Sequence, residues 1–280
     1  MSMRRDPLEE QLQPPDRVHY ATGLLLDAQD FQAEQTYHRG RLARALAYLH
    51  GYGTIAGLKV EWEGPMSDDE EIAVRPGIAL DRLGRTIEVQ RDACIRLNRW
   101  YQGQPVDDLI QGLHGAPFNG VVADVFVRFV VCERGKTPAF ASGPFDALDA
   151  VVPSRLRDYY ELELVIRKEA DPPLPQSQWP PFAGIEEPAS QRTATHNAIL
   201  DAWRDGPDTW TNQGPAPLPE HAVGQETTSV FLARITIPAT AGAPGERPTR
   251  AEGQAVQVDN DSRPFIYSSG VVASVLGLTT

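Results

Sequence analysis

The chain has 280 residues, 41% of them hydrophobic and 23% charged, which is enough to bury the core of one large or two small globular domains. A formal net charge of −12 opposes non-specific nucleic-acid binding, which needs clustered basic residues to neutralise phosphates. No run approaches the roughly 20 apolar residues that span a bilayer, and the first residues lack the apolar core of a signal peptide. We therefore expect a cytoplasmic protein without a membrane span or a nucleic-acid partner.

Residues 1–26 predict an irregular arm that leads into a long helix. Asp27 suits the N-cap, and Asp30 adds negative charge to the first turn, where the helix dipole favours it. A stripe at three- and four-residue spacing then covers about six turns and comprises Phe31, His38, Leu42, Ala45, Leu46 and Leu49. Glycines at 51 and 53 predict the helix stop. The pattern indicates a helix packed on the rest of the protein.

Strand signals dominate the region after the helix. Residues 54–64 and 72–89 alternate apolar and polar side chains between turn signals, which predicts a β-meander. A short helix is expected around residues 106–113. Residues 120–132 are rich in valine and phenylalanine on both faces, as in a central buried strand. Two later segments, residues 159–166 and 229–237, alternate as strands with one solvated face do.

Residues 168–227 form a proline-rich insertion with a helical patch near residues 189–205. The predicted fold class is therefore α+β and β-rich, with a long N-terminal helix packed on antiparallel sheets in a sandwich or barrel-like body. The expected organisation is an arm at 1–26, a helix plus β-rich core at 27–167, the insertion at 168–227, and core-completing strands at 228–280. Within the insertion, a binding role is conceivable for three aromatic side chains, Trp179, Trp203 and Trp210. They could equally pin the insertion to the core.

Three local patterns resemble functional motifs only in part. Residues 51–57 are glycine-rich but follow a helix and precede a strand, the reverse of a dinucleotide-binding loop, so they predict a helix stop with close packing. Glu34 and His38 share a helix face, yet a di-metal site needs two such pairs, and a buried or capping histidine is the preferred interpretation. Residues 259–261 begin like a calcium loop but lack its glycine and glutamate, which favours a turn.

The sequence provides no set of residues for catalysis. Cys94 and Cys132 lie in separate strand-like runs without metal-ligand spacing, so reduced core cysteines are expected, and a pair across neighbouring strands stays open. Nucleophile-elbow, P-loop and zinc-protease motifs are absent. A hydrolase whose carboxylates meet only in the fold remains one hypothesis, and it requires two acidic side chains at one cleft. We expect no enzyme activity, no cofactor and no metal.

A longer pattern resembles a family of poorly characterised bacterial proteins associated with phage-tail-like contractile injection systems. Its first block spans residues 20–38 and 49–60, and its second spans residues 74–87. Shorter matches lie at residues 153–162 and 231–235. The resemblance covers roughly residues 18–170 and 228–280 but not the insertion. Its marker residues are Tyr20, Gly23, Asp30, Phe31, Glu34, Tyr37, His50, Gly51, Gly53, Gly57, Pro76, Gly77, Gly84 and Arg85.

The resemblance implies a structural part of a tail-like particle, at the baseplate or at its periphery, and it brings no catalytic residues. Expected partners are baseplate, sheath or tube proteins and further copies of the chain, in a cytoplasmic particle. The alternative hypothesis is a fibre-like or carbohydrate- or receptor-binding module that uses the tryptophans of the insertion.

Overall fold

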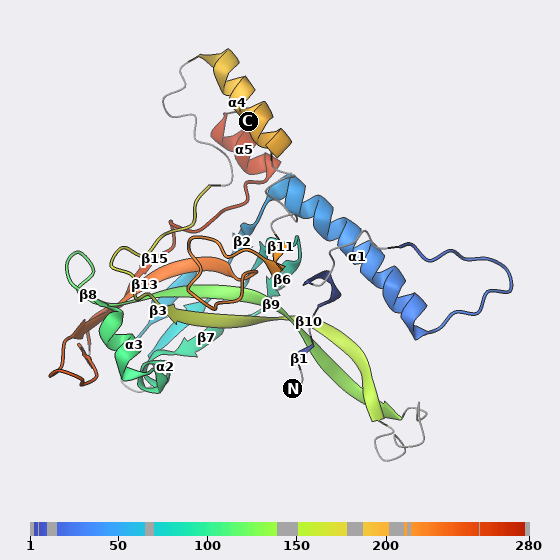
Figure 1. The fold of residues 1–280 in the computed structure, drawn as a ribbon. Helices are drawn as coiled ribbons and strands as arrows, with labels where there is room; N and C mark the ends of the chain where they lie inside the picture. The colour runs from blue at the N-terminus through green and yellow to red at the C-terminus, as the bar shows by residue number, and fades with distance from the viewer. Residues whose placement is uncertain are drawn as a thin grey trace.

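The computed structural model describes residues 3–4, 6–9, 16–64, 70–138, 151–177, 187–201, 210–211, 214–251 and 253–277. It is an α+β protein rich in strands, as the sequence predicts, and Figure 1 shows its helices at the periphery of the sheets. The helices are η1 (Pro7–Glu9), α1 (Ala28–His50), α2 (Leu97–Gly103), α3 (Val106–Gln111), α4 (Pro188–Asp201) and α5 (Ser269–Val275).

Local signals set the bounds of α1. The Asp27 carboxylate accepts hydrogen bonds from the backbone N–H groups of Gln29, at 2.7 Å, and Asp30, at 3.1 Å. Asp30 in turn accepts from the Asp27 N–H at 2.9 Å, which completes a capping box. At the other end Gly51 adopts a φ of 73°, and its N–H donates to the Ala47 carbonyl at 2.9 Å. The predicted start and end of the helix are both confirmed.

A seven-stranded antiparallel sheet is the largest layer (Figure 1). Its centre is β9 (Gly120–Pro138), which pairs along its length with β10 (Val151–Ile166) and, on the opposite side, with β13 (Val230–Thr240). The remaining strands of the sheet are short: β1 (Met3–Arg4), β8 (Leu113–His114), β14 (Thr249–Arg250) and β15 (Gln257–Asp259). All three predicted long strands are present, and each is longer than its sequence signal.

The region predicted as one meander forms two separate three-stranded sheets, so that prediction is wrong in its sheet assignment. One sheet has the order β2-β5-β6, from β2 (Gly53–Gly57), β5 (Gly77–Leu80) and β6 (Thr86–Val89). The other has the order β3-β4-β7, from β3 (Val60–Glu63), β4 (Glu71–Val74) and β7 (Ala93–Arg96). The chain leaves the first sheet at Gly57 and Leu58, both with positive φ, which breaks the single strand expected over residues 54–64.

The main core lies between the large sheet and the two small ones. Odd-numbered residues 121–131 of β9 and alternate residues of β13 belong to one buried cluster with side chains of β3, β4, β5 and β6. The opposite face of β9 is buried too, because the segment 214–229 lies over it: Phe126 contacts both His221 and Phe231 through its ring. The sheets thus stack as layers, and none of them closes into a barrel within the described residues.

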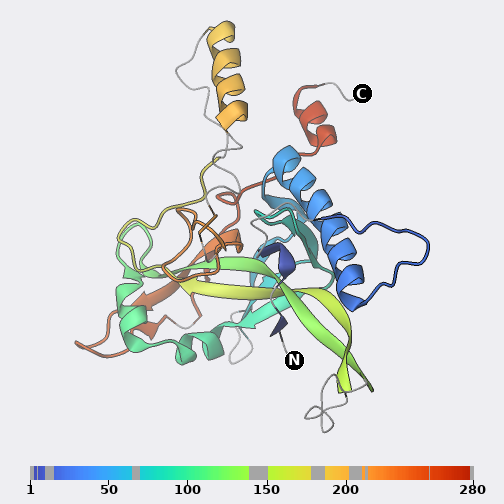
Figure 2. The ribbon, with the colours of Figure 1, turned by 45° about the vertical axis from the view of Figure 1, so that its right-hand side comes forward.

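Several elements reach beyond this layered body. The helical patch predicted in the insertion is α4, which has no buried residue and stands away from the sheets (Figure 2). A two-stranded pair, β11 (Trp210–Thr211) and β12 (Gly214–Pro215), lies further along the chain. The ends of β9 and β10 project together as a twisted ribbon (Figures 1 and 2). No helix in the described part of the chain is long and apolar enough to cross a membrane.

Candidate functional site

The first residues of the sequence marker lie before α1 and along its first half, and His50 lies at its end. Asp30 caps the start of α1, and His50 is its last residue. Phe31 and Tyr20 are exposed, and Gly23 lies in open surroundings with a φ of 86°. Glu34 is 3.7 Å from His38, whose ring stacks edge-on against Tyr37. This group therefore lies on the surface of α1 or before it.

The marker glycines allow backbones to touch. A Cβ on Gly53 would overlap the Pro264 carbonyl, and one on Gly57 would overlap the carbonyl of Pro76. Gly77 lies on the paired strand β5, and a Cβ on it would overlap the backbone of Ala56 and Leu58. The interpretation of residues 51–57 as a helix stop with close packing is confirmed. These positions need glycine because a side chain there would overlap the neighbouring backbone.

Gly84 and Arg85 join α1 to the body. Gly84 has a φ of 80°, and a Cβ there would overlap the backbone of Ala43 on α1. Arg85 is buried, with its guanidinium 4.6 Å from the centre of the Phe129 ring. It donates to Asp81 at 2.7 Å, to Thr228 at 3.1 Å and to Glu9.

This arginine connects distant segments by charge. Glu9 and Asp6 come from the N-terminal segment, and Asp6 also accepts a hydrogen bond from Arg39 of α1 at 2.9 Å. Burial disfavours the charged guanidinium, but the Asp81 and Glu9 carboxylates outweigh it and raise the pKa of Arg85 above its usual value. The junction is therefore an internal ion network that fixes α1 and the N-terminal segment to the body.

The helix packs on the body as expected, but most of the predicted apolar stripe of α1 faces away from it, and Leu46 is its one half-buried large apolar residue. Phe31, Leu42 and Leu49 are 53%, 62% and 76% exposed. Small residues line much of the side that meets the body, together with Arg39 and Tyr48, and Ala43 is the only buried residue of this fully described helix. His38 is exposed as well, so the expectation of a buried or capping histidine is wrong.

A second ion network anchors the beginning and the return of the insertion. Buried Asp124 of β9 accepts two hydrogen bonds from Arg234, at 2.7 and 2.9 Å, and one from Arg167 at 3.1 Å. Arg234 also donates to the Pro172 carbonyl at 2.7 Å, and Arg167 donates to the Glu220 carbonyl. Burial raises the pKa of Asp124 above its usual value, while its hydrogen bonds with Arg234 oppose the shift.

The surroundings of the buried His221 side chain favour its neutral form. Its Nδ1 accepts from the Leu218 N–H at 3.0 Å, and its Nε2 lies 3.0 Å from the Ser229 carbonyl. Burial is the main cause that lowers the pKa of His221, and Arg82 and Arg167 add to the effect. Sequence reasoning gave His221 no role, because its partners are backbone groups that no side-chain motif reveals.

The ribbon is the part of the large sheet with the least support. We define the β9–β10 ribbon as residues 134–138 and 151–157, all of which are exposed. Residues 134–138 pair antiparallel with residues 151–155, while Leu156 and Arg157 pair with Glu133 and Cys132. Three apolar side chains of β10 lie exposed on it, those of Val151, Val152 and Leu156. An isolated two-stranded ribbon is marginally stable in water, so a surface of this kind suits contact with another protein.

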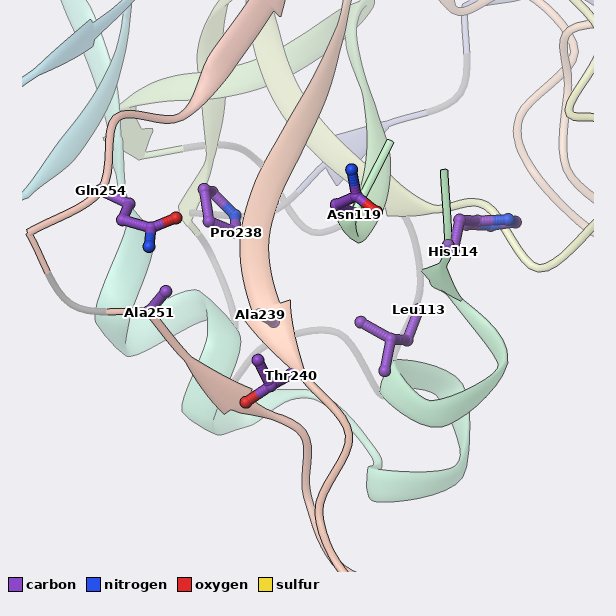
Figure 3. Close-up of a pocket in the computed structure, with 9 residues that line it drawn as sticks. Leu113, His114, Asn119, Pro238, Ala239, Thr240, Ala251 and Gln254 are labelled. Carbon is purple, nitrogen blue, oxygen red and sulfur yellow. The ribbon is translucent and has the colours of Figure 1, made fainter. Parts of the chain in front are cut away.

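An open cavity of about 470 Å³ lies where β9 begins and β13 ends (Figure 3). The described residues of its lining include no carboxylate, so they do not supply the acidic pair that a glycosidase needs. His114 and Gln254 lie on opposite sides of β13 in Figure 3 and do not converge on one point.

The remaining candidates do not form a site among the described residues. No group of three or more His, Cys, Asp and Glu side chains is placed to hold a metal ion in that part of the chain. Both cysteines are free, Cys132 buried and Cys94 exposed, so the expectation of a core thiol fails for Cys94. Asp259 accepts from the Asp261 N–H at 2.8 Å, which confirms the predicted turn. Trp179, Trp203 and the side chain of Trp210 lie outside the described residues.

Comparison with known proteins gives no relative from which a role could be transferred. Neither a protein-family model nor a curated protein sequence matches the chain. The candidate functional surfaces are therefore defined by geometry: the exposed stripe of α1 and the β9–β10 ribbon.

Proposed function

We propose that this protein is a non-enzymatic structural or assembly component of a phage-tail-like contractile injection particle, associated with its baseplate. It would act through interfaces with baseplate, sheath or tube proteins and with further copies of itself. The resemblance of residues 18–170 and 228–280 to proteins of such systems suggests the particle. The surfaces described above support a role in assembly.

The β9–β10 ribbon is the observation that carries this proposal. Its two strands leave the layered body with every residue of 134–138 and 151–157 exposed, including Val152 and Leu156. Strand pairs that stand alone gain little stability from their own hydrogen bonds. A partner protein that covers these apolar side chains would remove them from water and hold the ribbon in one position. A contact of this kind would join the protein to a particle.

The buried carboxylates of the body form ion pairs within the chain, which agrees with a structural role. The buried carboxylates Asp81 and Asp124 are each held by arginines of the same chain and by defined hydrogen bonds. A catalytic acid or base would need to reach a substrate at a cleft. These groups stabilise junctions between segments instead.

The test is incorporation of ribbon variants into particles. Val152→Asp combined with Leu156→Asp should leave the isolated protein folded, because both side chains are exposed, and should remove it from purified particles. Val223→Asp is the matched control: an equally apolar, fully exposed side chain on the body, whose change should leave incorporation unaltered. Incorporation of the ribbon variant at the level of the unmodified chain would contradict the proposal.

A further inference from the structure

The exposed residues of α1 follow the spacing of a helix-pairing seam. Six exposed positions alternate by four and three residues, and we call them the α1 seam: Phe31, Gln35, His38, Leu42, Ala45 and Leu49. This is the a/d repeat of a coiled coil, in which each seam residue inserts between residues of a second helix. The seam spans about 27 Å at 1.5 Å per residue.

The opposite side of α1 is built for a different contact. Thr36, Gly40, Ala43 and Ala47 form a set of small residues whose exposure is reduced by the body. At 100° per residue their mean direction lies about 150° from that of the seam. The helix therefore packs on its own body along a line of small side chains and turns Phe31, Leu42 and Leu49 outward, whereas Leu46 and Tyr48 are half-buried. Both ribbon views show α1 along the outside of the molecule (Figures 1 and 2).

We propose that the first four residues of the α1 seam, Phe31, Gln35, His38 and Leu42, pair antiparallel with the same four residues of a second copy of this chain, around a two-fold axis between residues 36 and 37. In this register Ala45 faces Ala28 of the second copy, and Leu49 lies beyond the first residue of its α1. Phe31 faces Leu42 of the second copy, and Leu42 faces Phe31. Gln35 faces His38 of the second copy, so two polar side chains meet at the centre and can hydrogen-bond to each other. A central polar pair of this kind fixes the register of paired helices.

Charge complementarity selects the antiparallel direction. Glu34 and Arg41 flank the seam on the same side, two turns apart, and Arg41 is exposed. In the antiparallel register Glu34 of each copy lies beside Arg41 of the other, which gives two symmetry-related ion pairs. A parallel pair would bring Glu34 near Arg39 instead, and Arg39 is already bound to Asp6 at 2.9 Å. Opposed helix dipoles also favour the antiparallel pair.

This inference names one partner for the proposed structural role, and to that extent it rests on the proposed function. A two-fold interface uses the same patch on both copies and closes after two. The ribbon is then left available for other proteins, because it lies on a different element.

The first experiment measures the mass of the purified full-length chain by sedimentation equilibrium over a concentration series. The unmodified protein should be a dimer, and Leu42→Asp should be a monomer, because it places two charges in the seam. Ala33→Asp is the matched control: it adds the same charge to an exposed position of α1 away from the seam and should stay dimeric. A monomeric unmodified protein, or a dimer that persists in Leu42→Asp, would overturn the proposal.

A charge exchange tests the direction without touching the apolar seam. Glu34→Arg and Arg41→Glu should each weaken the dimer by about tenfold, because each creates two like-charge contacts. The double variant should regain the affinity of the unmodified chain. Glu34 and Arg41 are too far apart on one helix to contact each other, so recovery requires the second copy. A double variant no better than the single ones would exclude the antiparallel register.

A dimer interface on another helix would give a different result. Dissociation by Val275→Asp of α5, with Leu42→Asp still dimeric, would assign the interface to α5 and overturn the proposal. The dimer experiment and the particle experiment test the two proposals separately. A dimer absent from particles removes the proposed function alone, whereas a monomer present in particles removes the α1 pairing alone.

Discussion

At the scale of single residues, the side chains with the most partners connect segments far apart in sequence. Arg85 reaches Glu9 and Thr228, which lie 76 and 143 positions away. The sequence singled out Gly84 and Arg85 only as marker residues of a family resemblance, because local spacing carries no information on which distant carboxylates will come near. The cap of Asp27 was predictable for the opposite reason, since its partners are two and three residues away.

His221 gives a pH prediction at this scale. Its pKa is lowered in the folded state, so the neutral form stabilises the fold above the unfolded pKa of about 6.5, and this contribution is lost as the pH falls below it. His221→Gln removes the titrating group. The difference in unfolding free energy between the unmodified chain and the variant should be constant above about pH 7 and should change as the pH falls below about 6.5.

Urea unfolding at several pH values measures that difference, and acidic groups common to both proteins cancel in it. A difference that does not vary with pH would show that His221 is not held neutral by the Leu218 N–H and the Ser229 carbonyl.

At the scale of elements, sequence reasoning predicted which segments are helices and strands better than what they face. Caps and turn residues act locally, so the start and end of α1 could be predicted. The periodicity of Phe31, Leu42 and Leu49 shows that one side of α1 is apolar, but it cannot say whether that side meets the body or a second molecule. The alternating strands of residues 54–89 likewise match either small sheet, because both need the same pattern.

The contact between Gly84 and α1 can be tested with a matched pair of substitutions. Gly84→Ala should destabilise the protein by about 3 kcal/mol, since it adds a left-handed alanine and a clash with Ala43. Gly224→Ala shares the φ of 80° but has no atom within 4 Å, so it should cost only about 1 kcal/mol. Thermal or urea unfolding compares the two, and equal losses would mean that the approach of α1 to this turn is not close.

At the scale of the whole molecule, the layered sheets are joined by charge as well as by apolar packing. The sequence predicted the strand-rich body but gave no indication that Asp124, inside the most apolar strand, organises two arginines. A lone aspartate in an apolar run has no spacing signature. Its role appears only when β13 and the chain after β10 converge on it.

Asp124→Asn tests this organisation. It leaves the buried guanidiniums of Arg167 and Arg234 without their shared carboxylate, so unfolding should become easier by about 3–5 kcal/mol, and residues 168–227 should be cleaved faster by proteases. Asp92→Asn breaks an exposed pair with Arg75 and should cost less than about 1 kcal/mol. Similar small losses for both variants would contradict a structural role for the Asp124 network.

The central claim, that this chain is a structural component of a contractile injection particle, is tested most directly by mass spectrometry of particles purified from the native host. The account predicts that the chain is present in a fixed, small ratio to the sheath subunit, as expected for a component near the baseplate. Its absence from intact particles would contradict the account.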